Sequence, residues 1–92
     1  MYRIIDKRGT GKTSRLFLLA KETNAVIVCA NELDLREKAH NYGITGLTFL
    51  NYADCLLAAE RREDRKILID DLEKFAQFMT GFHTIGYTLS ED

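Results

Sequence analysis

The continuous apolar run at residues 25–30, Ala-Val-Ile-Val-Cys-Ala, constrains the fold of this chain more than any other stretch. In a strand, successive side chains point to opposite faces, so a strand formed here would present apolar side chains on both faces. Its β-branched residues favour the extended conformation. The run therefore predicts a strand of a parallel sheet that is covered by helices on both faces.

Strand-like and helix-like patterns alternate along the rest of the chain without a linker-like gap. The predicted strands lie at residues 2–5, 26–29, 47–50, 67–70 and 84–89. The predicted helices cover 12–23, 31–42, a segment that begins near 51 and a segment that ends near 79. Asn31 with Asp34, and Asn51 with Asp54, resemble capped helix starts, so each asparagine is expected to cap the helix that follows it. This order predicts an α/β fold, a single three-layer α/β/α domain with a five-stranded, mostly parallel sheet.

The length and the net charge of the chain limit the classes of protein to which it can belong. At 92 residues the chain forms one domain, residues 1–92, near the small end for a self-sufficient core. A formal net charge of −1 offers no electrostatic footprint for nonspecific nucleic-acid binding. No apolar run approaches the roughly 20 residues of a membrane span, and the first residues lead straight into a predicted strand. We expect a cytoplasmic protein with no membrane partner, and the charge does not indicate a nucleic-acid partner.

The cysteine and histidine residues give no metal-binding pattern. Cys29 and Cys55 lie in an apolar strand-like run and a helix-like run, where buried free thiols are expected. Together with His40 and His83 they are widely and irregularly spaced, which is not a zinc signature.

Residues 6–13 read Asp-Lys-Arg-Gly-Thr-Gly-Lys-Thr, between the first predicted strand and the first predicted helix. Gly9, Gly11, Lys12 and Thr13 fall where a phosphate-binding loop has two glycines, a lysine and a hydroxyl. Glycine lets successive N–H groups curl around phosphate oxygens, and the helix directs its free N–H groups at the same anion. The pattern predicts that Lys12 reaches the outer phosphates and that the Thr13 hydroxyl binds Mg²⁺.

A second element completes the pattern. Residues 67–71, Ile-Leu-Ile-Asp-Asp, form an apolar strand that ends in two carboxylates. A phosphate-binding loop needs such a strand to deliver an acid to the metal, and Asp70 has that position. The alternative is a solvent-exposed strand end with an aspartate helix cap. The loop itself departs from the general pattern at Asp6, where the pattern has glycine.

Together these elements resemble the P-loop NTPases, specifically their RecA-like and helicase-like branch. The loop matches the Walker A motif and the acidic strand the Walker B motif. The chain also resembles small P-loop proteins encoded in phage and prophage genomes of Gram-positive bacteria. The resemblance covers nearly the whole chain and implies a minimal P-loop NTPase core. In the implied strand order, 2–5 neighbours 84–89, followed by 67–70 and 26–29, with 47–50 at the edge.

The resemblance also implies roles for individual residues. The implied nucleotide-binding residues are Arg8, Gly9, Thr10, Gly11, Lys12, Thr13 and Ser14. Thr13 and Asp70 would hold Mg²⁺. Asp71 stands where the family's catalytic glutamate polarises the attacking water, and it is one methylene shorter. Thr88 or Ser90 would sense the γ-phosphate, although both also suit ordinary strand-end hydroxyls.

The expected function is binding of ATP and Mg²⁺, with hydrolysis that is weak or depends on a partner. The short Asp71 and the absence of a second domain limit the expected hydrolysis. ATP is favoured because the chain lacks the Asn-Lys-x-Asp motif that reads guanine. The alternative, motivated by Asp6, is a P-loop fold retained as a protein-interaction scaffold.

A protein partner or a second copy is expected, because Phe75, Phe78 and Phe82 gather near one end, although these residues also suit a core helix.

Overall fold

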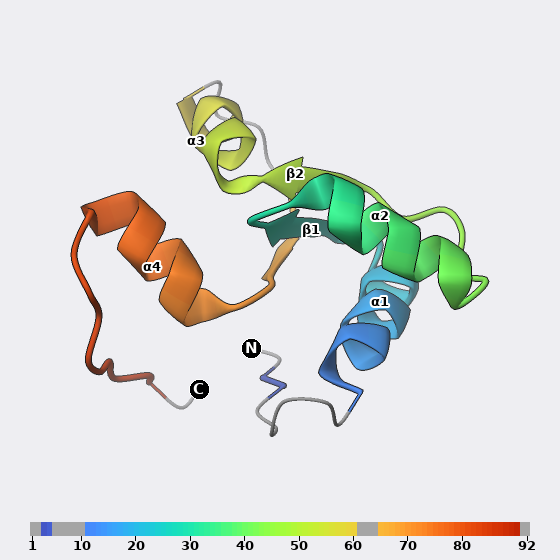
Figure 1. Ribbon diagram of the computed structural model, residues 1–92, viewed down its shortest axis with the longest axis horizontal. Helices are drawn as coiled ribbons and strands as arrows, with labels where there is room; N and C mark the ends of the chain where they lie inside the picture. Colours follow the sequence, from blue (N-terminus) through green and yellow to red (C-terminus); the bar gives the residue numbers. More distant parts are fainter. Residues whose placement is uncertain (1–2, 5–10, 61–64, 91–92) are drawn as a thin grey trace.

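The computed structural model describes residues 3–4, 11–60 and 65–90 of the chain (Figure 1). Helices and strands alternate as the sequence predicts. The elements are α1 (Lys12–Thr23), β1 (Val26–Cys29), α2 (Glu32–Asn41), β2 (Phe49–Asn51), α3 (Tyr52–Glu60), β3 (Ile67–Ile69) and α4 (Leu72–Thr80). None of the helices in the described part of the chain has the length and apolar character needed to cross a bilayer.

The sheet has three parallel strands in the order β2-β1-β3. The apolar run of the sequence forms the central strand, all four residues of which are buried. Ile27 pairs with Phe49 on one side and with Leu68 on the other, so these three side chains share one face of the sheet. The order of the three strands agrees with the order implied for residues 67–70, 26–29 and 47–50.

The prediction of a five-stranded sheet is wrong, because the described residues form only three strands. Residues 83–90 are in no strand, and Ile85 in their midst is 95% exposed. Of the first predicted strand, residues 3–4 are not in a strand, and 2 and 5 lie outside the described residues. An alternating pattern gives a strand only where backbone groups meet a partner edge, and the segment after α4 passes along the side of α4 that faces away from the sheet before it turns back (Figure 1).

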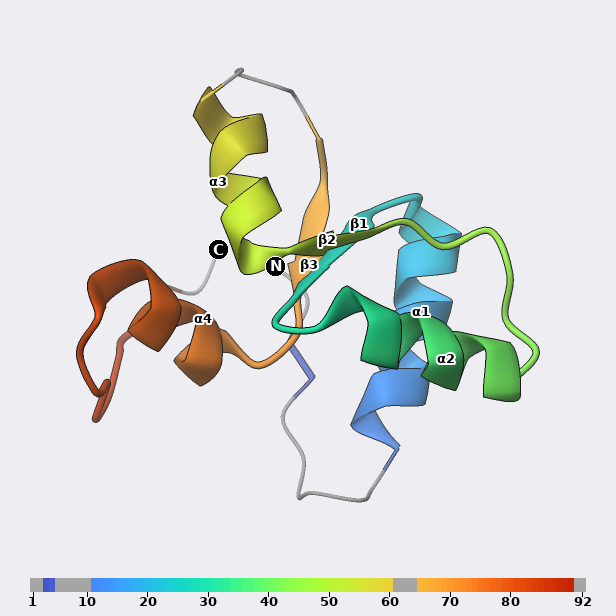
Figure 2. The same cartoon turned by 45° about the horizontal axis from the view of Figure 1, so that its top comes forward.

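The core lies between the sheet and the first two helices. Phe17 of α1 is fully buried and packs edge-on against Phe49 of β2, with ring centroids 5.9 Å apart. Leu35 and Ala39 bring α2 into the same cluster, which includes Ile27 and Cys29 of the central strand and Leu16 and Ala20 of α1. In both ribbon views α3 lies on the other side of the strands from α1 (Figure 2). The helices therefore cover both faces of the sheet.

Candidate functional site

The candidate site begins at the first turn of α1. Gly11 is the N-cap, with a left-handed backbone (φ 85°), and has no side chain with which to cap the helix. A Cβ on Gly11 would lie 3.7 Å from Ser14 Oγ, an ordinary contact, so the positive φ and not lack of space favours glycine. The Ser14 hydroxyl donates to the Gly11 carbonyl oxygen at 3.1 Å. Gly11 therefore supplies no side-chain acceptor to the first N–H groups of α1, and such N–H groups at a helix N-terminus can bind an anion.

The structure places only part of the predicted loop. Gly11, Lys12, Thr13 and Ser14 lie at the start of α1, with the last three side chains half-buried. The remaining loop residues predicted to bind nucleotide, and Asp6, lie outside the described residues; the predicted ones are Arg8, Gly9 and Thr10.

Asp70 lies immediately after β3, at the carboxyl edge of the sheet. Its backbone N–H donates to the Val28 carbonyl oxygen at 2.9 Å, which continues the parallel ladder by one residue. Burial raises the pKa of the half-buried Asp70 carboxyl above its usual range, and the charge of Asp71 adds to this effect. The ammonium groups of Lys38, Lys74 and Lys12 act in the opposite direction. The Asp70 carboxyl is thus held between a second carboxylate and several ammonium groups.

Asp71 is engaged in a helix cap. It is the N-cap of α4 and has a left-handed backbone with φ 59°. Its Oδ1 accepts a hydrogen bond from the Lys74 backbone N–H at 3.3 Å, and its Oδ2 lies 3.9 Å from Lys74 Nζ. This is the cap that the sequence allowed as the alternative to a catalytic acid. The catalytic role of Asp71 stays a prediction, and this carboxylate already has a structural role.

Sequence reasoning missed Tyr52, the first residue of α3. Its hydroxyl donates to the backbone carbonyl oxygen of Asp70 at 2.7 Å and to that of Asp71 at 3.2 Å. Burial raises the pKa of Tyr52 to about 12, and the charges of Asp70 and Asp71 add to this rise. The hydroxyl therefore stays protonated at neutral pH and holds the corner between β3 and α4. The one sequence signal is that a buried tyrosine needs a polar partner for its hydroxyl.

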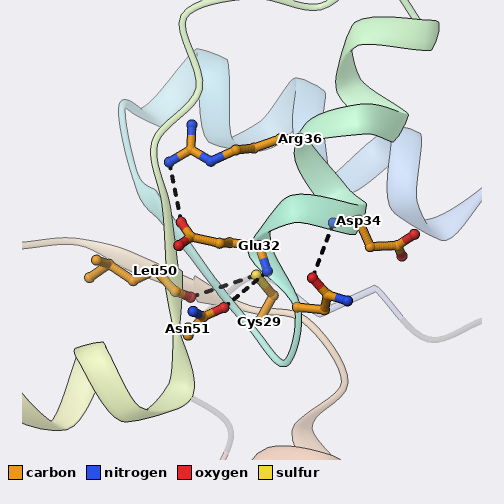
Figure 3. A network of polar contacts seen from close by, with 7 residues as sticks. Cys29, Glu32, Asp34, Arg36, Leu50 and Asn51 are labelled. Atoms are coloured by element: carbon orange, nitrogen blue, oxygen red, sulfur yellow. Dashed lines mark hydrogen bonds and ion pairs between the residues drawn. The ribbon is translucent and has the colours of Figure 1, made fainter.

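Cys29 ends β1 beside this corner and is buried. Its thiol donates to the Leu50 carbonyl oxygen, with a sulfur–oxygen distance of 3.6 Å (Figure 3). Burial raises the pKa of Cys29 to about 11, and the charges of Asp70 and Glu32 contribute. The side chain is thus a neutral thiol that fills the core, which suits neither a nucleophile nor a metal ligand.

Two asparagine side chains occupy the N-terminus of α2. Asn31 Oδ1 accepts from the Asp34 backbone N–H at 3.2 Å, which confirms the cap predicted at this position. Asn51 Oδ1 accepts from the Glu32 backbone N–H at 3.0 Å (Figure 3). The sequence predicts instead that Asn51 caps its own helix, α3. Because side-chain amides satisfy these N–H groups, α2 differs from α1, whose first turn has no capping side chain.

An open groove of about 660 Å³ lies beside the site, along the carboxyl ends of β1 and β2 and against α4. Its walls include Asn51, Tyr52, Lys74, Gln77 and Phe78. Lys74 therefore borders both the groove and the carboxylates at the end of β3.

The predicted sensors lie elsewhere. Thr88 and Ser90 are exposed and are not part of a strand. The Ser90 carbonyl oxygen accepts a hydrogen bond from Arg3 Nη2 at 3.0 Å. A role of either hydroxyl in sensing phosphate stays a prediction.

Within the described ranges, no three histidine, cysteine or acidic side chains gather closely enough to hold a metal ion. Magnesium does not require such a group, because it keeps several waters and is usually bound through one or two carboxylates and substrate phosphates. A hydroxyl on Thr13 and a carboxylate on Asp70 suit this type of coordination.

Comparisons with protein-family models, with curated proteins and with solved structures found no match for this chain. The resemblance to P-loop NTPases therefore depends on the sequence motifs alone.

Proposed function

We infer that this chain binds a nucleoside triphosphate with Mg²⁺, ATP being favoured, at the N-terminus of α1 and the end of β3. One observation carries the proposal. Gly11, which has no side chain that could cap the helix, is the N-cap of α1 in a left-handed conformation, and Lys12 and Thr13 follow it in the first turn. A phosphate group needs free N–H donors and a cation, and Mg²⁺ needs a nearby carboxylate.

Different residues would bind the phosphate groups and the Mg²⁺ ion. The N–H groups of the first turn of α1 would bind phosphate oxygens, and Lys12 would neutralise the outer phosphates. Thr13 and Asp70 would hold Mg²⁺, which when bound neutralises phosphate charge. A bound cation also stabilises the ionised Asp70, whose carboxylate is otherwise destabilised by burial. Arg8, Gly9 and Thr10, which the sequence predicts to bind nucleotide, lie outside the described residues.

The proposal includes little or no unaided hydrolysis. A catalytic carboxylate must be free to contact the attacking water. Both oxygens of Asp71 instead face Lys74, one of them as the acceptor of the α4 cap. Turnover would then require a partner that rearranges this corner. We propose that the protein acts in the cytoplasm as a phage-encoded accessory protein.

Isothermal titration of ATP, with and without Mg²⁺, tests the proposal on the wild type, on Lys12→Ala and on Lys21→Ala. Lys21 is an exposed lysine at the opposite end of α1 and is the matched control. We expect Mg²⁺-dependent binding by the wild type and by Lys21→Ala, and binding weakened at least tenfold in Lys12→Ala. That loss corresponds to about 1.4 kcal/mol, which a charge-assisted contact readily supplies. Negligible binding by all three proteins would refute the proposal.

An interaction scaffold without turnover is the second candidate. The observation that favours it is the use of Asp71 as a helix cap, together with the exposed apolar side chains on the adjoining α4. The same titration separates the two candidates, because a scaffold with an empty site would not bind ATP.

A further inference from the structure

The backbone of Asp70 is held from two sides. Its N–H donates to the Val28 carbonyl oxygen of β1 at 2.9 Å, and its carbonyl oxygen accepts from the Tyr52 hydroxyl at 2.7 Å. The backbone has only two soft dihedral angles per residue, so a residue that is held at both its N–H and its carbonyl keeps its Cα–Cβ bond in one direction. The direction in which the Asp70 side chain leaves the chain therefore depends on β1 and on Tyr52.

The Tyr52 hydroxyl reaches Asp70 across the central strand of the sheet. Tyr52 begins α3 directly after β2, and β2 and β3 lie on opposite sides of β1. Tyr52 is buried, and its ring packs against the rings of Phe75 and Phe78, with centroids 5.2 and 5.7 Å away. Close packing leaves a buried ring little freedom to move. Tyr52 is therefore a rigid link between the carboxyl ends of β2 and β3.

The residue after Asp70 also depends on this hydroxyl. Asp71 has a left-handed backbone, with φ 59°, which is unfavourable for a residue that has a side chain. Such a conformation persists only where the surrounding structure holds it, and it is common at functional sites. The Asp71 carbonyl oxygen accepts from the Tyr52 hydroxyl at 3.2 Å. One hydroxyl thus binds both carbonyl groups of the turn that carries the predicted metal-binding acid.

The Asp70 carboxylate differs from its neighbour in having no partner among the described residues. Both carboxylate oxygens of Asp71 face Lys74, whereas no described residue forms a hydrogen bond or an ion pair with the Asp70 carboxylate. The Asp70 side chain is half-buried, and burial without a partner disfavours its charge. A cation bound there would stabilise this charge. A fixed backbone and a carboxylate without a partner are what a metal-binding acid requires.

We propose that Tyr52 is a positioning residue for Mg²⁺ binding, because its hydroxyl fixes the backbone of Asp70 and so the direction of the metal-binding carboxylate. The inference rests on the proposed function, since the metal is the Mg²⁺ of the bound nucleotide. Groups around a metal site orient the ligands that bind the ion. Without the Tyr52 hydroxyl, the ion would have to order the turn between β3 and α4 as it binds, which lowers its affinity.

Amide nitrogen relaxation of the chain without nucleotide tests the positioning itself. We expect the order parameters of a rigid backbone, about 0.85, at Asp70 and Asp71 in the wild type, and lower values in Tyr52→Phe. Tyr42→Phe is the matched control, because Tyr42 is 55% exposed and its ring also packs against another ring, and it should leave both values unchanged. Equal order parameters in the wild type and in Tyr52→Phe would overturn the proposal.

Titration of ATP with and without Mg²⁺ tests the consequence for the metal. The measured quantity is the factor by which Mg²⁺ strengthens ATP binding. We expect Tyr52→Phe to lower this factor about fivefold, as for the loss of one neutral hydrogen bond, and to leave the affinity for ATP without Mg²⁺ unchanged. A purely structural loss would weaken both titrations alike. In the Asp70→Asn background, Tyr52→Phe should have no further effect on the factor, because Tyr52 acts through Asp70.

A substitution that keeps a donor should restore the wild-type behaviour. Replacement of Tyr52 with para-aminophenylalanine leaves an N–H donor at the end of the ring, and we expect it to retain the Mg²⁺ factor that Tyr52→Phe loses. Circular dichroism verifies that each variant is folded.

The outcomes distinguish this inference from the proposed function. A wild type that does not bind ATP with Mg²⁺ would refute the proposed function, and with it the role of Tyr52 in metal binding. A wild type that binds, together with an unchanged Mg²⁺ factor in Tyr52→Phe, would overturn the positioning role alone. A further loss of the factor when Tyr52→Phe is added to Asp70→Asn would do the same, since Tyr52 would then act by another route.

Discussion

Replacing Tyr52 with phenylalanine removes the hydroxyl that holds the corner between β3 and α4. The ring keeps its contact with Phe75, so the change deletes two hydrogen bonds with little effect on packing. Tyr52 is 4% exposed, and its stronger bond, to the Asp70 carbonyl oxygen, is 2.7 Å long. A neutral hydrogen bond contributes about 1 kcal/mol net, and the neighbouring Asp71 carbonyl is exposed enough for water to replace its bond.

We therefore expect Tyr52→Phe to lower the free energy of unfolding by about 1 kcal/mol, which lowers Tm by roughly 4–8 °C in a domain of this size. Urea and thermal unfolding followed by circular dichroism measure both quantities. Tyr42→Phe is the control, because Tyr42 is 55% exposed and its ring also contacts another aromatic ring, that of Phe17. Hydrogen exchange should show the larger loss of protection in α4, which Tyr52 anchors.

The reasoning fails if Tyr52→Phe is as stable as the wild type, or if Tyr42→Phe loses the same stability. It also fails if amide protection falls equally in α1 and α4. In those cases the hydroxyl would not be what attaches α4 to the sheet.

Two further predictions concern titrating groups. Burial and the charge of Asp71 raise the pKa of Asp70 in the folded state, so ionisation of Asp70 destabilises the fold. The protonated carboxyl destabilises nothing below about pH 4, where it is protonated in both the folded and the unfolded chain. The free energy of unfolding then falls as the pH rises through the folded pKa. Asp70→Asn should thus have a higher free energy of unfolding than the wild type at neutral pH and lose that advantage in acid. Urea unfolding at several pH values measures the difference. A variant that is less stable than the wild type at neutral pH would contradict this prediction. Burial raises the pKa of Cys29 to about 11 and shields its thiol, so Cys29 should react with iodoacetamide more slowly than the more exposed Cys55 at mildly alkaline pH. Mass mapping of the native and urea-unfolded protein measures both rates, and equal rates in the native protein would contradict the burial of Cys29.

The features that the sequence predicts well are local. The apolar run at residues 25–30 forms the central strand because continuous apolar side chains require cover on both faces. Helix α1 has the predicted bounds, 12–23. Asn31 caps α2 because its side chain reaches an N–H group three residues away. Each prediction depends on neighbours along the chain.

The features that the sequence does not predict depend on partners far along the chain. Residues 84–89 alternate like a strand, but a strand needs an edge to pair with, and the path after α4 provides none. Asn51 resembles a cap for its own helix, yet its side chain accepts from Glu32 of α2. The Tyr52 hydroxyl finds its acceptors 18 and 19 residues away.

In the candidate site, too, some features follow from the sequence and others from the tertiary structure. The sequence alone determined which residues have the chemistry for phosphate and Mg²⁺, because glycine, lysine and carboxylate carry that chemistry wherever they lie. The tertiary structure decided which neighbours these side chains have: it placed Asp70 at the end of a strand paired with β1 and assigned Asp71 to the α4 cap. The physical reason is that charge interaction and hydrogen bonding depend on distance in space, which parallel strands and their crossovers set and sequence spacing does not.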